Sequence, residues 1–312
     1  MSKPDRTLIY PLFIPNEACP GGCVYCDQRK ISGVESFDLD AAIPALQAFI
    51  RRNLGRKKEI AFYGGSFTAM PLKRQEMLLS RVFEILDEYT SIRISTHPAY
   101  LKDAALELCH KYRVKTIELG IQDFCDRPLR ESGRNYNGKE ALEACCKVRS
   151  DGFTLGVQLI PGLPGSNAQT LKTNIEILGD LAPDLLRLYP LVVIKGTLLE
   201  GLYRRGEYRP LQLSEAVSIC ADYTEYCLPL SIRIIKYGLP SNLDPEDVVA
   251  GAFHPAFGEL VKQELLIRKL EKEPDLLAQL DAQQIQLLRA HKCSYLNSHS
   301  SARSRELGEE LH

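Results

Sequence analysis

The sequence predicts an α/β fold: a partial (β/α)6 barrel of the TIM type with a short helical C-terminal extension. Two observations carry this prediction. β-rich runs alternate with stretches of helical periodicity over most of the 312 residues, and turn residues separate them. The expected strands are 7–13, 59–63, 91–95, 114–120, 153–160 and 185–190. The expected helices are 39–54, 72–89, 100–112, 137–150, 166–181 and 212–227.

The pattern changes after about residue 265, where it becomes helical and charged. We therefore expect a catalytic domain over residues 1–265 and a helical extension over 266–312. The last twenty residues are polar, and we expect them to be mobile.

Composition limits the class of protein. Hydrophobic residues make up 45% and charged residues 25%, as in ordinary globular proteins, which excludes a disordered, collagen-like or disulfide-stapled chain. No apolar run approaches the ~20 residues that span a bilayer, and the N-terminus lacks the apolar core of a signal peptide. We expect a cytoplasmic protein with no membrane contact.

The net charge of −1 argues against a dedicated DNA-binding module, yet local basic patches can still contact phosphates. Two basic clusters stand out. For the first we favour solvated positions at a helix end; its members are Arg51, Arg52, Arg56, Lys57 and Lys58. For the second both interpretations stay open; its members are Arg204, Arg205 and Arg209, with Tyr203 before them and Tyr208 between them.

Three of the ten cysteines lie in one Gly-rich loop after the first expected strand: Cys19, Cys23 and Cys26, in C-x3-C-x2-C spacing. Gly21 and Gly22 give the backbone more conformational freedom, so the loop can place three thiolates on the same side of the loop. We expect the other seven cysteines to be reduced, small and buried. They are Cys109, Cys125, Cys145, Cys146, Cys220, Cys227 and Cys293.

Three kinds of site compete for this loop. Structural zinc needs a fourth protein ligand, and neither a histidine nor a second CxxC lies nearby. A ferredoxin-type cluster also needs four cysteines. A [4Fe–4S] cluster held by three thiolates leaves one iron open to the amino and carboxylate groups of S-adenosylmethionine, whose sulfonium bond an electron from the cluster can break. The spacing favours this third interpretation.

With Tyr25 as its aromatic residue, the loop resembles the C-x3-C-x-aromatic-C signature of the radical S-adenosylmethionine superfamily. The resemblance implies a radical S-adenosylmethionine barrel, with Cys19, Cys23 and Cys26 as metal ligands and Tyr25 near the cofactor. It also implies a [4Fe–4S] cluster, S-adenosylmethionine and a 5′-deoxyadenosyl radical. A reductant such as flavodoxin or ferredoxin is then a partner.

The second expected strand ends in Tyr63-Gly64-Gly65-Ser66. Paired glycines at a strand end allow a ligand to approach the backbone, although a simple turn explains them equally well. In the superfamily this position holds the methionine amino end of the cofactor. The resemblance therefore places Gly64, Gly65 and Ser66 in the cofactor shell.

In the fourth expected strand, Glu118, Gly120 and Gln122 share one face. A carboxylate and an amide beside a glycine suggest a polar barrel interior that receives a ligand. The alternative is that Glu118 is neutralised by a neighbouring Arg or Lys. The fifth strand ends in the rigid exit at residues 161–165, which contains two prolines and two glycines.

The segments IQDF and QLIPGLP, with Arg134, resemble oxygen-independent coproporphyrinogen oxidase. There the matching glutamine, arginine and an aspartate handle the ribose, adenine and carboxylate of the cofactor, which assigns Gln122, Arg134 and Gln158 to the cofactor shell. Gln158 stands where that branch has Asp, and Ser95 stands where it has Glu. These departures weigh against that branch.

A second resemblance, over residues 7–265, is to the catalytic subunit of Elongator, which modifies the tRNA wobble uridine. GGSFT, IELGIQ, IPGLPG, YPLVVIKGT and the His-containing FHPAFGEL carry it. It implies tRNA as a substrate, with Tyr189, Lys195, Tyr203 and His254 facing it. Lys195 could equally be a surface cation, and His254 a structural histidine.

About fifty residues follow the barrel, too few for the acetyltransferase domain of the Elongator subunit. The chain thus resembles a short bacterial form without that domain, and either its substrate differs or a separate acyltransferase is a partner. Three hypotheses remain: a radical enzyme acting on tRNA, a radical enzyme acting on a small molecule or protein side chain, and a non-enzymatic metal-binding module.

Overall fold

The computed structural model describes residues 7–15, 17–19, 21–239 and 243–290. Its centre is a curved, seven-stranded parallel sheet in the order β1-β2-β3-β4-β5-β6-β8. The strands are β1 (Leu8–Phe13), β2 (Lys58–Tyr63), β3 (Thr90–Thr96), β4 (Val114–Gln122), β5 (Thr154–Leu159), β6 (Leu185–Leu188) and β8 (Arg233–Tyr237). The predicted α/β partial barrel is confirmed, and the six predicted strands are all present.

The seventh strand, β8, was not predicted. Its sequence, RIIKY, interrupts a short apolar run with two cations, and most of its residues are only half-buried because it pairs on one side alone, with β6. An edge strand of this kind lacks both the continuous apolar run and the alternation that identify strands in a sequence.

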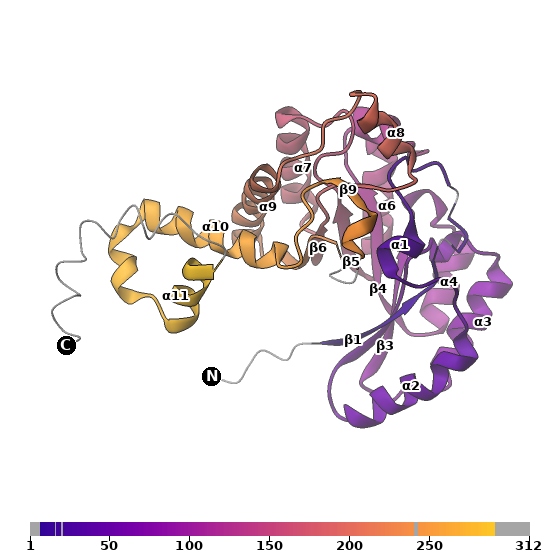
Figure 1. The fold of residues 1–312 in the computed structure, drawn as a ribbon. Coiled ribbons are helices and arrows are strands. Elements are labelled where there is room, and N and C mark those ends of the chain that lie inside the picture. The colour runs from indigo at the N-terminus through magenta and orange to yellow at the C-terminus, as the bar shows by residue number, and fades with distance from the viewer. Residues whose placement is uncertain (1–6, 16, 20, 240–242, 291–312) are drawn as a thin grey trace.

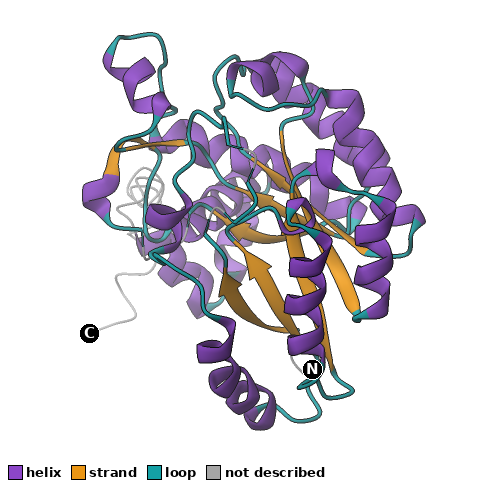
Figure 2. Ribbon diagram, turned by 90° about the vertical axis from the view of Figure 1, so that its right-hand side faces the viewer, coloured by secondary structure: helices purple, strands orange, loops and turns teal. Residues whose placement is uncertain are grey.

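The helices that follow the strands pack outside the sheet (Figure 2). They are α2 (Leu39–Arg52), α3 (Leu72–Phe83), α4 (Asp103–Lys111), α6 (Gly138–Ser150), α7 (Ala168–Leu181) and α9 (Leu213–Cys227). Side-chain caps begin several of them: Asn137 and Asn167 each form a capping box with the residue three positions later.

Helix α3 ends six residues before the predicted position. Beyond Phe83 the backbone bonds tighten to i→i−3, from Ile85 to Val82 and from Leu86 to Phe83. The Asp87 carboxylate then accepts hydrogen bonds from the Tyr89 amide and the Thr90 hydroxyl. Aspartate that bonds to nearby groups in this way competes with helical backbone bonds. The chain therefore turns here and enters β3.

Between these units lie three short helices and a small antiparallel pair of strands. The helices are α1 (Gln28–Ser32), α5 (Asp126–Glu131) and α8 (Leu198–Arg204), and the strands are β7 (Val192–Ile194) and β9 (Val248–Gly251). Leu191, Val193 and Leu199 form an apolar cluster against which Cys23 and Cys26 pack. The Leu199 amide also donates to the Val24 carbonyl at 2.7 Å, so this segment covers the cysteine loop.

Helices α10 (Phe257–Lys272) and α11 (Ala282–Arg289) project from the barrel (Figure 1). Phe257 and Val261 belong to the main core, whereas Leu270 packs with Leu288 in a separate small cluster. Helix α10 is thus continuous across residue 265, where the sequence pattern changes. The C-terminal twenty residues, which we expected to be mobile, lie outside the described part of the chain.

Arg268 fixes α10 against α9. Its guanidinium contacts Asp222 and Glu225, each at 2.7 Å, and the Ser218 hydroxyl at 2.7 Å. Among the described residues, no helix has both the length and the apolar character needed to cross a membrane.

Two expectations about single residues were wrong. Cys146, expected to be buried, is exposed on α6 because its neighbour Cys145 takes the core-facing position. Lys58, expected at a solvated helix end, is only 1% exposed in β2. Its ammonium contacts the Asn53 and Arg56 carbonyls and, at 2.9 Å, the Asp87 carboxylate, so the buried charge is satisfied.

Candidate functional site

A cavity of about 430 Å³ opens at the carboxyl ends of the parallel strands. In α/β barrels this is the end where active sites form. Every strand of the seven-stranded sheet contributes at least one lining side chain, and the cysteine loop closes one side. The strand residues are Pro11, Phe13, Tyr63, Ser95, Thr96, Gly120, Gln122, Gln158, Arg187 and Lys236.

Cys19, Cys23 and Cys26 all line this cavity. Burial raises the pKa of the Cys26 thiol to about 12, and the neighbouring sulfurs act in the same direction. Thiols of this kind become ligands only when a cation displaces their protons. In the described residues, no three His, Cys, Asp or Glu side chains are placed to hold a metal ion as they stand.

Arg134 points at the cysteine loop. Its guanidinium donates to the Cys23 sulfur at 3.1 Å and to the Gly120 carbonyl at 2.7 Å. Gly133 permits this placement: its φ is +73°, and a Cβ there would lie 2.0 Å from the Gly22 carbonyl oxygen. Only glycine allows the two loops to approach this closely. Burial raises the pKa of Cys19 and Cys26, and the Arg134 charge acts in the opposite direction with a smaller effect.

The paired glycines after β2 also line the cavity, and Gly65 has in addition a packing role that was not predicted. A Cβ on Gly65 would lie 2.7 Å from the Glu17 carbonyl and 2.8 Å from the Ile14 carbonyl. Its missing side chain therefore admits the chain's own loop after β1. The Ser66 hydroxyl is also engaged within the protein, since it accepts a hydrogen bond from the His97 amide at 3.1 Å.

Gln122, by contrast, has an unsatisfied group. The strand register shifts between Gly120 and Gln122, and Gln122 has a φ of +67°. Its side chain lies over Gly120, where a Cβ would be 2.8 Å from the Gln122 Nε2. The Oε1 atom is buried without a hydrogen-bond partner among the described residues. A buried acceptor of this kind carries a free-energy cost that a ligand donor would remove.

Tyr25 shows the same feature. It lines the cavity, and its hydroxyl is buried without a partner in the described chain. The residues expected in the cofactor shell that lie around this one cavity, together with Tyr25, are Gly64, Gly65, Ser66, Gln122, Arg134 and Gln158.

Glu118 does not line the cavity, and its predicted contact with the cofactor was wrong. It is 1% exposed beneath the floor, where Arg93 donates to it at 2.6 Å and Arg187 donates to both of its oxygens. Tyr63 and Gln158 complete the set at 2.9 and 3.0 Å. Burial acts to raise its pKa, but Arg187 and then Arg93 hold the pKa of Glu118 at about 2. The alternative of neutralisation by neighbouring arginines is confirmed.

Arg93 and Arg187 were not predicted to be part of the site. Arg93 also bonds to Glu59, and Arg187 donates to the Tyr189 hydroxyl at 3.2 Å. Each arginine is a single charge inside an apolar strand, IRI and LRL. That pattern could have indicated a polar barrel interior, since buried charges need partners.

Of the four residues expected to face the substrate, only Tyr189 lines the cavity. Lys195 is exposed, and its carbonyl accepts from the Lys30 ammonium at 2.7 Å. Tyr203 is 36% exposed on α8. The His254 ring accepts from the Ala256 amide at 3.1 Å. The β7–α8 segment folds over the cysteine loop and carries Lys195 and Tyr203 to the outer surface.

The second basic cluster is charge-neutralised. Each of its arginines pairs with a glutamate on the surface: Arg204 with Glu200, Arg205 with Glu207, and Arg209 with Glu215. Tyr208 is buried, and its hydroxyl donates to the Gly162 carbonyl at 2.7 Å. Tyr208 is therefore not available to stack on a nucleic-acid base, and Tyr203 is the exposed aromatic residue of this cluster.

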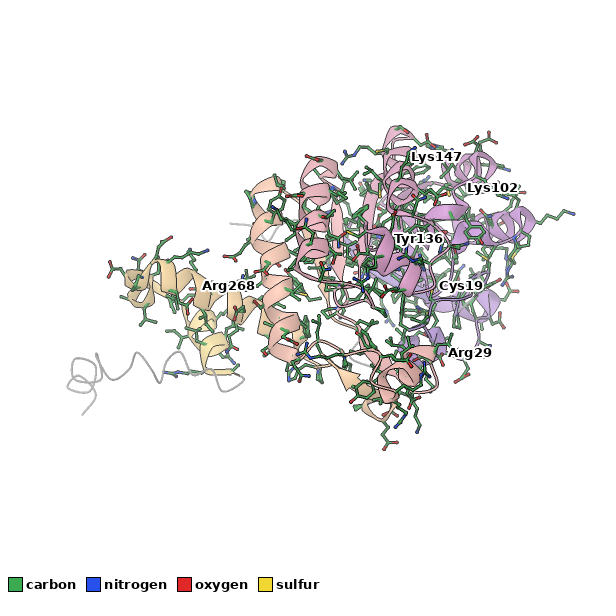
Figure 3. The ribbon with its side chains drawn as sticks, turned by 90° about the horizontal axis from the view of Figure 1, so that it is seen from above. Cys19, Arg29, Lys102, Tyr136, Lys147 and Arg268 are labelled. Atoms are coloured by element: carbon green, nitrogen blue, oxygen red, sulfur yellow. The ribbon has the colours of Figure 1, made fainter. Side chains whose placement is uncertain are left out.

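His97 is a cavity residue that the sequence did not single out. It packs edge-on against Tyr136, and its Nδ1 accepts from the Ala99 amide. Burial, and then the charge of Arg134, lower the pKa of His97 to about 3. Seen from above, Tyr136 and Cys19 lie on the half of the molecule away from Arg268 (Figure 3).

We expect His97 to make the protein sensitive to mild acid. Its pKa is about 6.5 when unfolded and lower when folded, so its stabilising effect is complete above pH 6.5 and is lost as pH falls toward 3. As the pH falls from 6.5 to 5, we expect the free energy of unfolding to decrease by ~2 kcal/mol because of His97. Urea unfolding of wild type and His97→Asn measures it, since asparagine keeps an acceptor for Ala99 without titrating. An unchanged pH dependence in the variant contradicts the assignment.

Two protein-family models match this chain. The family described as Radical SAM superfamily matches residues 13–178, more than half of the chain, and the Radical_SAM C-terminal domain matches residues 183–266. The second match covers β6, β7, β8 and β9.

Individual relatives are more distant. A tRNA uridine(34) acetyltransferase of Methanocaldococcus infernus is 25% identical over 229 residues, which cover 66% of this chain and 42% of that protein. A heme chaperone, HemW, of Lactococcus lactis is 26% identical over 255 residues, covering 77% of this chain and 64% of that one. The chain thus spans roughly half of these relatives.

The structure resembles that of the archaeal Methanocaldococcus infernus Elp3 with an N-terminal deletion. The TM-score is 0.64 at 22% identity, and the match covers 86% of this chain and 63% of the other. At that identity the likeness supports the fold alone, a partial barrel.

Proposed function

Because the chain belongs to the radical S-adenosylmethionine superfamily, we propose that it cleaves S-adenosylmethionine reductively in this cavity and uses the resulting radical to modify a tRNA nucleoside. The composition of the cavity wall is the observation that supports S-adenosylmethionine cleavage. Three cysteines, the Arg134 cation and a buried, unpartnered Gln122 oxygen surround one volume at the carboxyl end of the barrel.

The residues present fit the two cofactors that the family uses. Cys19, Cys23 and Cys26 would hold the [4Fe–4S] cluster, because their three thiols face one volume and no fourth cysteine lies among the described residues of the cavity wall. When bound, the cluster supplies the electron that breaks the sulfonium bond of S-adenosylmethionine.

The chain's own groups orient the cofactor. Arg134 places its positive charge beside the sulfurs and would stabilise the ligating thiolates. Gln122 would accept a hydrogen bond from a ribose hydroxyl or the adenine amino group. Tyr25 would supply a hydroxyl from the cysteine loop. The apolar β7–α8 cover keeps water from this side of the loop.

Replacing Gln122 by alanine is expected to weaken S-adenosylmethionine binding by roughly threefold to tenfold, the effect of one lost hydrogen bond. The iron content should stay unchanged, because Gln122 touches no cysteine. Equilibrium binding measured anaerobically tests this, with Gln169→Ala as a control at an exposed glutamine. If Gln122→Ala binds as wild type does, the residue does not contact the cofactor.

Support for tRNA as the substrate comes from the relative named tRNA uridine(34) acetyltransferase. Exposed Tyr203 on α8 offers a surface for stacking on a base. An electron carrier such as flavodoxin or ferredoxin would supply the reductant, and a separate acyltransferase would supply any acyl transfer. Since the arginines near Tyr203 are paired, RNA binding should be modest and salt-sensitive.

The test is to add bulk tRNA to the reduced enzyme at low salt and follow 5′-deoxyadenosine. We expect faster formation with intact tRNA than with the same tRNA digested to nucleosides. Modified nucleosides of a deletion strain are compared with wild type in parallel.

The paired arginines favour a second candidate, a small molecule or a protein side chain as substrate. The same experiment separates the two. No stimulation by tRNA, together with unchanged nucleosides in the deletion strain, would rule out tRNA and favour this second class.

A further inference from the structure

The charged side chains that line the cavity are all cationic. Arg134, Arg187 and Lys236 line it, and no Asp or Glu does so among the described residues. Two of these cations already have partners: Arg134 contacts the Cys23 sulfur, and Arg187 contacts Glu118 below the floor. The Lys236 ammonium, by contrast, has no hydrogen bond or ion pair with any described residue, although its backbone pairs with β6 in the sheet.

The position of Lys236 makes this lack of a partner costly. Lys236 on β8 is in register with Arg187 on β6, so two cations stand next to each other on neighbouring strands. Like charges at such positions are unfavourable. Burial, and then the charge of Arg187, lower the pKa of Lys236. An anion placed between the two side chains would relieve the repulsion.

The neighbourhood also offers the donors that an oxyanion needs. The Lys236 ammonium has three N–H donors, none of which bonds to a described residue. Tyr189 lines the same cavity and accepts from Arg187, so its own hydroxyl hydrogen remains available. The Gln158 amide nitrogen, by comparison, already donates hydrogen bonds to Ser95 and Glu118.

We propose that Lys236, together with Tyr189, binds an oxyanion of the substrate, a phosphate or a carboxylate, and that the substrate of this enzyme is therefore an anion. This proposal rests on the proposed function in one respect: the cluster and S-adenosylmethionine are assigned to the part of the cavity next to the cysteine loop. The cysteine loop follows β1, at the opposite edge of the sheet order from β8, so Lys236 is assigned to the substrate.

The experiment measures binding of small anions to the oxidised, cofactor-loaded protein, in which no turnover occurs. Uridine 5′-monophosphate tests the phosphate source, and glutarate tests the carboxylate source. Uridine and glutaramide are the matched neutral probes. We expect one anion to bind and its neutral counterpart to bind at least about tenfold more weakly, in line with a charge-assisted hydrogen bond.

Lys236→Gln should weaken binding of that anion by about tenfold or more, and Lys236→Arg should restore most of it. Arg233→Gln, an exposed cation on the same strand, is the control and should bind as wild type does. S-adenosylmethionine affinity should be unchanged in all three variants, which a merely structural role of Lys236 would not predict.

Three results would overturn the proposal: neither anion binds to wild type, Lys236→Gln binds the anion as wild type does, or Lys236→Gln loses S-adenosylmethionine affinity instead. A separate assay tests the proposed function: if the reduced enzyme does not cleave S-adenosylmethionine, the proposed function is wrong. Anion binding to the oxidised protein does not depend on that reaction.

Discussion

Alanine at Cys19, Cys23 or Cys26 is expected to reduce the iron content of anaerobically purified protein from about four per chain to a small fraction of that. Each of these cysteines lines the cavity, and no further cysteine of the described chain lines it to replace a lost thiolate. Iron and sulfide assays, with the visible absorption of the cluster, measure the loss.

The matched control is Cys146→Ala, because Cys146 is exposed and lies on α6 away from the cavity lining. Its iron content should equal that of wild type. Stoichiometric zinc in the wild type, or a cluster that survives removal of all three loop cysteines, would contradict the assignment.

Replacement of Glu118 by glutamine is expected to destabilise the protein by ~3–5 kcal/mol. Glu118 is 1% exposed and accepts from both Arg93 and Arg187. Without its charge, Arg187 becomes a buried cation with no carboxylate, and Arg93 keeps only Glu59. Breaking a buried pair from one side costs more than the pair contributes as a whole.

Urea unfolding under anaerobic conditions measures this change. Glu207→Gln is the control, since it removes a surface pair with Arg205 that solvent screens. The control should be nearly neutral. A loss below about 1 kcal/mol for Glu118→Gln would show that the two arginines find other partners or water.

The sequence predicted the parts of this molecule that depend on local patterns. Buried parallel strands form apolar runs, and all six predicted strands are present. The cysteine loop spans only eight residues, so its spacing alone indicated a metal site. Strand β8 was missed because an edge strand with two cations lacks these local signals.

The polar interior depends on contacts between distant residues, and the sequence could not supply them. Glu118 and Arg187 are 69 positions apart, and only the parallel pairing of β4, β5 and β6 brings them together. For the same reason Glu118 was misplaced in the cofactor shell, and Lys195 was expected at the substrate. The position of Lys195 depends on how β7 and α8 fold across the loop after β1.

The central claim is that this cavity cleaves S-adenosylmethionine reductively, and one measurement tests it most directly. The protein with its cluster is reduced anaerobically with dithionite in the presence of S-adenosylmethionine, and 5′-deoxyadenosine and methionine are quantified. The account predicts equal amounts of both products, none with the variant that lacks all three loop cysteines, and normal formation with Cys146→Ala. Absence of both products from wild-type protein with a full complement of iron would contradict it.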